Sequence, residues 1–469
     1  MNQDPRAFPQ GARAALNDAA LQGALARLKT HFGLKRQEAI DAFDDFEALR
    51  EAGRAIRDHA LDHLDTLLES FERNVTARGG QVHWARDAAE ARVAILTILR
   101  EAGAKTVTKG KSMVTEEIAL NPFLDANGIV PVETDLGEYI IQLRGEPPSH
   151  IIAPAFHLHK EQVADTFRGA HTTLDARRPL AERNDLVAEA RFMLRAQFEA
   201  ADAGITGANF LSAEEGAAII VTNEGNGDLT RLLPRTHIVV TGIEKVVPCL
   251  DDVAVLLRLL TRSASGQEIS SYVSVMSGPR ERECGEDPTS FHVVLVDNGR
   301  SKLIGTPAHD VLRCIRCAAC LNHCPIYSVV GGHAYGATYS GPIGAALNPG
   351  TMGVGVAHHH ANASTFCGRC AEVCPVKIPL PTIMRHWRAR EYAQGLTPRT
   401  TVIGLGLWAF AAKRPALYRR VARAAARVLK LFAGKRGVVH AMPLLNGWFA
   451  VRDFPAPQGK TFHELWRER

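Results

Sequence analysis

The sequence has 469 residues, of which 46% are hydrophobic and 22% charged, a composition typical of a soluble globular protein with two or three domains. Its 9 Cys are too sparse for a disulfide scaffold, and its longest apolar run, residues 402–412, is about half a membrane span. The N-terminus lacks the basic start and apolar core of a secretory signal, so we expect a cytoplasmic protein. The net charge of +5 is uneven, because residues 385–469 carry +13 and the remainder −8.

Residues 1–64 form an N-terminal helical extension. Apolar residues recur there at three- and four-residue steps with charges between them, which is typical of amphipathic helices. We expect this extension to pack on another domain or on a partner subunit and to carry no site.

Residues 65–303 alternate short apolar runs with amphipathic helices, which predicts an α/β domain with a mostly parallel sheet. No Gly-x-Gly-x-x-Gly follows a strand, which argues against a dinucleotide site. The expected strands are residues 105–107, 129–132, 139–143, 151–153, 217–222, 238–241, 272–275 and 293–296.

Several polar loops of this domain are candidate sites for an anion or for a catalytic carboxylate. Lys109-Gly110-Lys111-Ser112 opens a helix and could hold an anion on backbone amides, although it lacks the leading glycine of a P-loop. Residues 222–228 and 241–245 follow strands, where α/β sheets place their ligand crevices. Residues 133–135 and Glu138 flank another strand end. In each case, turn chemistry with a solvated charge is the alternative.

The cysteines of residues 304–384 carry the clearest chemical signal. The run Cys314-Ile-Arg-Cys317-Ala-Ala-Cys320-Leu-Asn-His-Cys324-Pro325 matches the bacterial pattern for a [4Fe–4S] cube, and Cys367-Gly-Arg-Cys370-Ala-Glu-Val-Cys374-Pro375 follows it. In two-cluster proteins the Cys before the proline ligates the other cluster. The predicted ligands are therefore Cys314, Cys317, Cys320 and Cys374 for cluster one, and Cys324, Cys367 and Cys370 for cluster two.

The second set contains only three thiolates. Either cluster two is a [4Fe–4S] cube with a non-cysteine or exchangeable ligand on one iron, or it is a [3Fe–4S] cluster. His358, His359 and His360 could supply a nitrogen or form a solvated loop, whereas Cys249 and Cys284 fit core or loop positions better than ligand positions. Zinc also binds Cys-x-x-Cys pairs, but zinc needs four ligands per site, and seven thiols with two Cys-Pro endings fit cubes better.

Residues 385–469 form a basic C-terminal helical region, whose charge indicates a docking surface for a negatively charged partner. Such a region can contact an anionic membrane or a partner groove, or it can pack on its own domain with a solvated basic face. Within it, residues 416–432 predict an amphipathic helix whose cations are Arg419, Arg420, Arg423, Arg427 and Lys430.

The whole layout resembles the lactate utilization protein B family, the iron–sulfur subunit of a three-component L-lactate oxidation system. The resemblance rests on Gly110-Lys111-Ser112, Glu116-Glu117, the 222–228 loop, the four-plus-three cysteines and the basic tail. It implies a lactate-utilisation α/β domain with a CoA-transferase- and sugar-isomerase-like fold. An α-helical ferredoxin-like domain with two [4Fe–4S] clusters would follow, the second cluster with three assigned thiolates. The implied partners are a cysteine-rich subunit and a second subunit with a lactate-utilisation domain.

Two functions are compatible with these features. The first is electron transfer to an unidentified acceptor during oxidation of L-lactate to pyruvate, in an oxidoreductase complex that lets lactate serve as a carbon source. The second is a hydroxy-acid-binding enzyme that uses the three-thiolate cluster as a Lewis acid. Nucleic-acid binding is disfavoured, because no helix-turn-helix or aromatic platform accompanies the basic tail.

Overall fold

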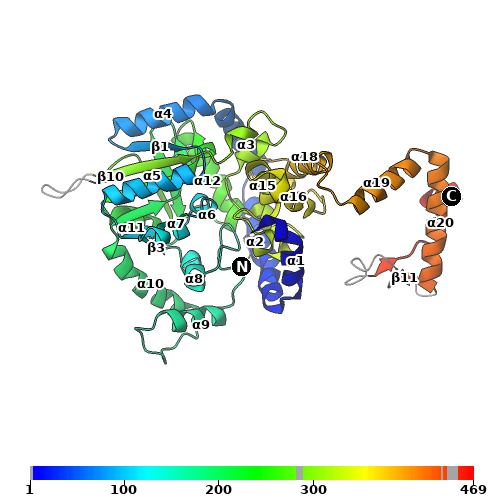
Figure 1. Ribbon diagram of the computed structural model, residues 1–469, viewed down its shortest axis with the longest axis horizontal. Coiled ribbons are helices and arrows are strands. Elements are labelled where there is room, and N and C mark those ends of the chain that lie inside the picture. Colours follow the sequence, from blue (N-terminus) through cyan, green and yellow to red (C-terminus); the bar gives the residue numbers. More distant parts are fainter. Residues whose placement is uncertain (1–3, 281–288, 435–436, 441–452, 469) are drawn as a thin grey trace. The chain divides into compact units, whose positions relative to one another are not determined.

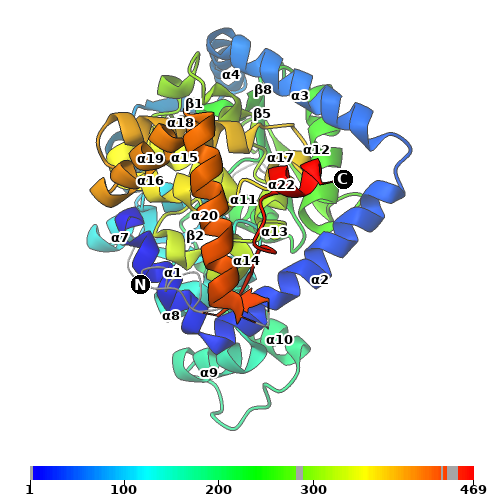
Figure 2. The ribbon, with the colours of Figure 1, turned by 90° about the vertical axis from the view of Figure 1, so that its right-hand side faces the viewer.

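The computed structural model describes residues 4–280, 289–434, 437–440 and 453–468. The chain divides into two compact units, Met1–Glu391 and Tyr392–Arg469. In the first unit, an α/β domain lies beside a helical part that contains the N-terminal helices and the cysteine loops (Figures 1 and 2).

A six-stranded sheet forms the centre of the α/β domain. All five strand pairs are parallel, which confirms the predicted sheet type. Two interior strands, Thr236–Gly242 and Ser290–Val296, are buried along almost their whole length, as expected for strands that are covered on both faces. The strand order is β1 (Gln81–Ala85), β10 (Ser290–Val296), β7 (Thr236–Gly242), β4 (Ala203–Thr206), β2 (Thr106–Lys109) and β3 (Val130–Glu133).

Alternate residues of the central strands face two different cores, as the pleat of a strand requires. Ile238 and Val240 of β7 pack with three helices on one face, whereas Val239 packs with one helix and a second, smaller sheet on the other. The helices on the first face are α5 (Ala88–Glu101), α6 (Met113–Glu117) and α7 (Leu120–Ala126), and the helix on the second is α4 (Leu64–Ala77).

The second sheet corrects part of the strand prediction. Residues 217–222 and 272–275, expected in the parallel sheet, form an antiparallel pair in this smaller sheet. Residues 139–143, expected as a strand, lie in helix α8 (Leu136–Arg144), and residues 151–153 are in no strand. The strand order is β8 (Val246–Val247), β5 (Phe210–Ser212), β6 (Ala217–Thr222) and β9 (Tyr272–Met276).

Helix α8 packs with two further helices around the fully buried Phe167. The remaining helices of the α/β domain follow β3, β6 and β8 in the chain. They are α9 (Lys160–Ala170), α10 (Arg183–Ala200), α11 (Asn226–Leu232) and α12 (Leu250–Ser265).

The N-terminal extension packs on the cysteine domain of its own chain, and the two share one hydrophobic core with α12. Polar contacts add to this packing: Arg50 donates to the carbonyl of Cys374 at 2.8 Å, and Arg36 donates to the carbonyl of Val373 at 3.0 Å. The N-terminal helices are α1 (Phe8–Asn17), α2 (Ala19–Asp41) and α3 (Phe46–Asp62). The cysteine domain contains η4 (His309–Arg313), α13 (Ala319–Asn322), α14 (Tyr327–Val330), α15 (Gly341–Thr351), α16 (Val354–Asn362), α17 (Arg369–Glu372) and α18 (Leu380–Ala393).

The second unit contains two longer helices, which contact each other, and a two-stranded antiparallel ladder. Large apolar side chains of the first of these helices, Trp408 among them, are exposed to solvent. Among the described residues, no helix combines the length and the apolar character needed to span a membrane. The elements of the unit are α19 (Arg399–Ala412), α20 (Pro415–Ala433), β11 (Val438–Val439), β12 (Phe454–Pro455) and α22 (Phe462–Arg467).

Candidate metal centre and adjoining cavity

The seven predicted ligand cysteines lie on two loops with short helices between them. Cys314 directly follows η4, Cys320 lies in α13, and Cys370 lies in α17. All seven are free thiols; Cys367 is exposed and the others are buried or half-buried. Cys249 is also free and precedes α12, whereas Cys284 lies outside the described residues. Free, mostly buried thiols that converge from two loops are suited to hold a metal cluster.

Left-handed backbone conformations shape both loops. Arg316 and Ala318, on either side of Cys317, have φ of 62° and 60°. Phe366 and Gly368, on either side of Cys367, have φ of 54° and 85°. A residue with a Cβ adopts this conformation at a cost of about 1–2 kcal/mol, so the surrounding packing must hold the loops in this form.

Four of the thiols interact electrostatically as one group. Burial raises the pKa of Cys317 to about 12, and the charge of Cys374 adds to the shift. Burial also raises the pKa of Cys320, and the charges of Cys314, Cys317 and Cys374 raise it further. These are the four cysteines that the sequence assigned to cluster one, and we call them the four-thiol group.

The other three thiols form a second group, which we call the three-thiol group. Burial raises the pKa of Cys370 to about 12, and the charges of Cys324 and Cys367 add to this shift. Cys370 also affects the pKa of Cys320, so the two groups are neighbours. The structure thus brings the seven predicted residues into one region of the cysteine domain, and their assignment to two clusters stays a prediction.

The surroundings of the thiols fit metal-bound sulfur. Backbone N–H groups donate to three of the sulfur atoms: Arg316 to Cys314 and Ile378 to Cys374, both at 3.4 Å, and Tyr327 to Cys324 at 3.5 Å. Buried thiols with raised pKa values lose their protons when a cation compensates the charge, and bound iron would supply this cation. Hydrogen bonds to sulfur then stabilise the thiolate form and tune the site.

The three adjacent histidines are not placed to complete the three-thiol group. His360 is fully buried, and both ring nitrogens have partners: the Tyr335 carbonyl at 2.7 Å and the Asn348 amide at 3.0 Å. None of His358, His359 and His360 lines the small cavity beside the three-thiol group.

His323, which sequence reasoning overlooked, does line that cavity, together with Cys324, Cys367 and Cys370. Its Nδ1 lies 2.9 Å from the carbonyl of Ala319. Because a carbonyl can only accept, Nδ1 carries the proton and Nε2 keeps a free lone pair. Burial lowers the pKa of His323, which favours the neutral form that can bind a metal. The signal was available, because His323 directly precedes a predicted ligand.

A larger cavity of about 360 Å³ lies where the α/β domain meets the cysteine domain. Residues of all four predicted polar loops line it, with Lys111, Asp135, Asn226 and Lys245 among them. The opposite wall includes Arg316 and Tyr339 of the cysteine domain, which the sequence did not indicate. The cavity therefore joins the carboxyl ends of the strands, the usual ligand position of α/β sheets, to the first cysteine loop.

Behind this cavity is a buried network of charges. Arg300 forms ion pairs of 2.7 Å with both Glu117 and Glu244, and Tyr339 donates to Glu117 at 2.8 Å. Arg316 Nη2 lies 3.3 Å from Glu244 Oε1. Burial alone would raise the pKa of Glu244, but the charges of Arg300 and Arg316 outweigh burial and hold this pKa at about 2. Both carboxylates are therefore ionised and already paired.

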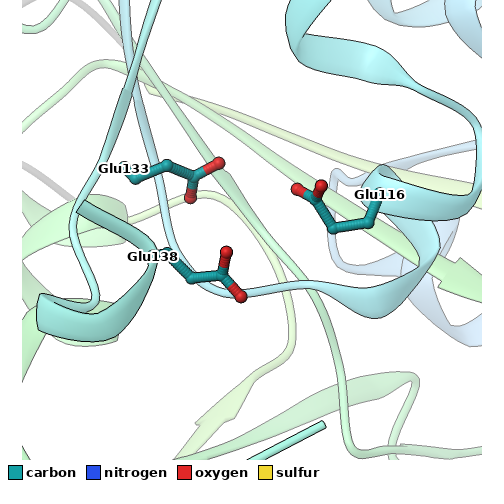
Figure 3. A group of neighbouring side chains, drawn as sticks. All are labelled: Glu116, Glu133 and Glu138. Atoms are coloured by element: carbon teal, nitrogen blue, oxygen red, sulfur yellow. The ribbon is translucent and has the colours of Figure 1, made fainter. Parts of the chain in front are cut away.

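A second buried cluster surrounds Lys109. Glu116, Glu133 and Glu138 turn their carboxylates toward one another (Figure 3), within a distance that would suit a metal ion. Lys109 Nζ, however, lies 2.7 Å from Glu133 and 3.0 Å from Glu116, so the ammonium already supplies the cation. Burial raises the pKa of Glu138 well above its ordinary value, and the charges of Glu133 and Glu116 add to this shift. Lys109 thus does not serve the anion site that its loop had indicated.

Three family models match successive parts of the chain. The model of the LUD domain matches residues 68–296, that of the 4Fe-4S dicluster domain matches residues 310–378, and that of the lactate utilisation protein B C-terminal region matches residues 393–469. The predicted fold class, an α/β domain followed by a ferredoxin-like cluster domain and a helical tail, is thereby confirmed.

Full-length relatives agree with these matches. The chain is 41% identical to lactate utilization protein B of Geobacillus sp. strain WCH70, over 100% of this chain and 98% of the relative. It is 42% identical to the protein of that name from Geobacillus thermodenitrificans, over 97% and 95%, and 40% identical to that from Bacillus subtilis, over 99% and 96%. The chain therefore belongs to the lactate utilization protein B family.

Proposed function

We propose that the chain is the electron-transfer subunit of a system that oxidises L-lactate to pyruvate. Membership of the family gives it a role in lactate utilisation, and its 4Fe-4S dicluster domain gives it iron–sulfur chemistry. The observation that carries the proposal is the convergence of seven thiols into two neighbouring groups. Two [4Fe–4S] clusters, when bound there, would take up and pass on single electrons.

In this proposal, Cys314, Cys317, Cys320 and Cys374 hold the first cluster. Cys324, Cys367 and Cys370 hold the second, with His323 Nε2 as the fourth ligand. Burial is the main cause of the raised pKa values of Cys317, Cys320, Cys324 and Cys370. The thiol charges that add to burial come chiefly from the same group, which supports both groupings. The shared cavity and the free lone pair support His323.

Two kinds of residue would set the affinity for electrons. Backbone N–H groups that donate to sulfur favour the more negative, reduced state, and so do nearby cations. Arg316 has only a tenth of its side chain exposed, whereas Arg369 is 41% exposed and paired with Glu372. Since solvent screens an exposed charge, Arg316 should influence its neighbouring group more strongly than Arg369.

The second candidate function, a hydroxy-acid enzyme with a Lewis-acidic second cluster, has less support. The cavity beside the three-thiol group measures about 20 Å³, enough for about one water molecule. The large cavity is lined by Arg316, next to the four-thiol group. Space for an organic acid therefore lies beside the group whose four ligands are all protein thiols.

The proposed partners are a cysteine-rich subunit and a second subunit with a lactate-utilisation domain. The second unit of the chain offers a further contact, because α19 exposes apolar side chains and α20 exposes arginines. An anionic membrane surface would satisfy both kinds of side chain.

The test is made on the full chain purified without oxygen. We expect about eight iron and eight sulfide per chain and a low-temperature electron paramagnetic resonance spectrum of two interacting clusters. L-lactate should reduce them only when the two partner subunits are added. Colourless protein with stoichiometric zinc would refute the proposal, and reduction by lactate in the chain alone would favour the enzyme.

A further inference from the structure

Three cations line the large cavity, Lys111, Lys245 and Arg316, and two carboxylates, Asp135 and Glu224, line it with them. Arg57, Lys245 and Arg300 are buried in or behind its wall, and Arg316 has a tenth of its side chain exposed. The buried Glu244 and the largely buried Glu117 lie beside them, and Arg300 is paired with both. Arg57 is bound by three backbone carbonyls, of Glu244, Val246 and Leu312. Among the described residues, Lys245 Nζ and Arg316 Nη1 have no hydrogen-bond partner.

Lys245 lies at the end of η2 (Ile243–Lys245), which follows the central strand β7. The residue is only 6% exposed and lines the cavity. Within the described part of the chain, its ammonium has no hydrogen bond and no ion pair. An isolated buried ammonium is unfavourable by several kcal/mol, so such a group usually has a partner. Consistently, burial and the charge of Arg316 lower the pKa of Lys245 to about 7.

Arg316 faces the same cavity from the cysteine domain. Its guanidinium lies 4.3 Å from the ring centre of Tyr339, and Nη2 reaches Glu244. Nη1 is buried and has no hydrogen-bond partner among the described residues. The Tyr339 ring and Glu244 thus fix the guanidinium, while Nη1 remains available to donate to a carboxylate oxygen.

We propose that this cavity binds the carboxylate of a small organic acid between Lys245 Nζ and Arg316 Nη1. The nearby Ser112 and Asn226, both buried and lining the same cavity, are available for a hydroxyl or carbonyl oxygen of that acid. Ile151 and Ile152 supply apolar wall for its carbon chain. That the acid is a 2-hydroxy acid or its 2-oxo product rests on the proposed function, whereas the anion site rests on the two cations alone.

The test measures binding to the cluster-loaded full chain by calorimetry, with L-lactate, pyruvate, D-lactate and inorganic phosphate as probes. We expect L-lactate or pyruvate to bind, and Lys245→Met to weaken that binding at least tenfold. Lys105→Met, which removes an exposed lysine of the same domain, should leave it unchanged. Lys245→Met should also unfold at a higher temperature than the parent without ligand, because it removes an unpaired buried charge.

Three results would overturn the proposal: no binding of either acid, binding that Lys245→Met does not weaken, or binding of phosphate alone. Lys245→Gln serves as a second variant if Lys245→Met does not fold. Iron and sulfide content are measured on every sample. A chain that binds the acid but holds no iron would refute the electron-transfer function and leave the acid site standing. A chain with full clusters and no acid binding would refute the acid site and leave the electron-transfer function standing.

Discussion

The guanidinium of Arg316 lies 4.3 Å from the ring centre of Tyr339, so a charge within the first cysteine loop is fixed against the wall of the large cavity. This contact joins the two chemical features of the molecule, the four-thiol group and the cavity, through one side chain. Because only a tenth of the side chain is exposed, its charge acts at short range and with little screening by solvent.

We therefore expect Arg316→Gln to lower the reduction potential of one cluster. A positive charge stabilises the more negative, reduced state, and its removal should shift the potential on the order of 59 mV, the equivalent of tenfold in a one-electron equilibrium. Arg369→Gln is the matched control, since Arg369 is exposed and paired with Glu372. Redox titration followed by electron paramagnetic resonance measures both. Equal shifts in the two variants would contradict the assigned roles.

Removal of a single thiol should separate the two groups. Cys374→Ser is expected to lose the first cluster, so that iron and sulfide fall to about half and one resonance signal disappears. Cys249→Ser is the control, because Cys249 precedes α12 and its thiol donates to Asp252 at 3.6 Å instead of joining either group. If Cys374→Ser kept full iron content, the division into four and three would be wrong.

The fourth ligand of the second cluster can be tested at His323. His323→Ala should change the resonance signal of that cluster and make one of its irons easier to remove by oxidation, because a nitrogen ligand is replaced by solvent. His359→Ala removes a histidine that does not line the cavity. Identical spectra for His323→Ala and the parent protein would exclude His323 as the fourth ligand.

The parallel sheet could be predicted because its interior strands are buried and therefore apolar in sequence. The errors arose where a short apolar run does not form a strand of that sheet. Strands β7 and β10 read as unbroken apolar runs since both of their faces are covered. The run 139–143 is also apolar and short, and periodicity alone cannot assign such a run to strand or helix. The flanking residues do: Asp135 caps the backbone N–H of Gly137 and Glu138, and Gly145 ends the helix with φ of 63°.

Within the candidate site, the sequence indicated the ligands that lie close together in the chain. It did not indicate which side chains from distant elements pair with one another. The spacing of the cysteines indicated both thiol groups, because each ligand loop is a local unit of sequence. That Lys109 is neutralised by Glu116 and Glu133, while Lys245 has no such partner, depends on contacts between distant elements. The chain positions of Arg316 and Tyr339 likewise give no sign that they close a cavity beside the α/β sheet.

The carboxylate cluster around Lys109 predicts an unusual dependence of stability on pH. The native state holds the proton of Glu138 more tightly than the unfolded state, because burial raises its pKa above the ordinary value of 4.5. This contribution is fully present below pH 4.5 and is lost as the pH rises through the native pKa. Glu138→Gln should therefore unfold at a higher temperature than the parent at pH 8, with a smaller difference at pH 5.

The exposed Glu161→Gln serves as the control for that comparison and should leave the midpoint unchanged at both pH values. Thermal unfolding of the cluster-loaded chain, followed by circular dichroism, gives the midpoints. A Glu138→Gln variant that is less stable than the parent at pH 8 would show that the carboxylate is ionised and stabilising in the native state.

The second unit predicts binding to anionic vesicles. Helix α19 exposes Ile403, Leu407 and Trp408, each by more than 60%, and α20 exposes Arg419 and Arg420. Apolar insertion combined with attraction to lipid headgroups should retain the full chain on vesicles with phosphatidylserine but not on neutral ones, and added salt should release it. Sedimentation measures the bound fraction, and a blue shift of tryptophan fluorescence would indicate that Trp408 enters the interface.

Charge on α20 is the decisive variable in that experiment. Replacement of three exposed arginines of the helix by Gln should weaken binding several-fold, since each cation near an anionic surface contributes about 1 kcal/mol. The same number of replacements among exposed arginines of the first unit should not. The two sets are Arg419, Arg420 and Arg427 for the helix, and Arg73, Arg183 and Arg191 for the control. An equal loss of vesicle binding in both sets would mean that net charge alone attracts the chain. Binding to a partner subunit without any binding to lipid would mean that the basic helix contacts that subunit.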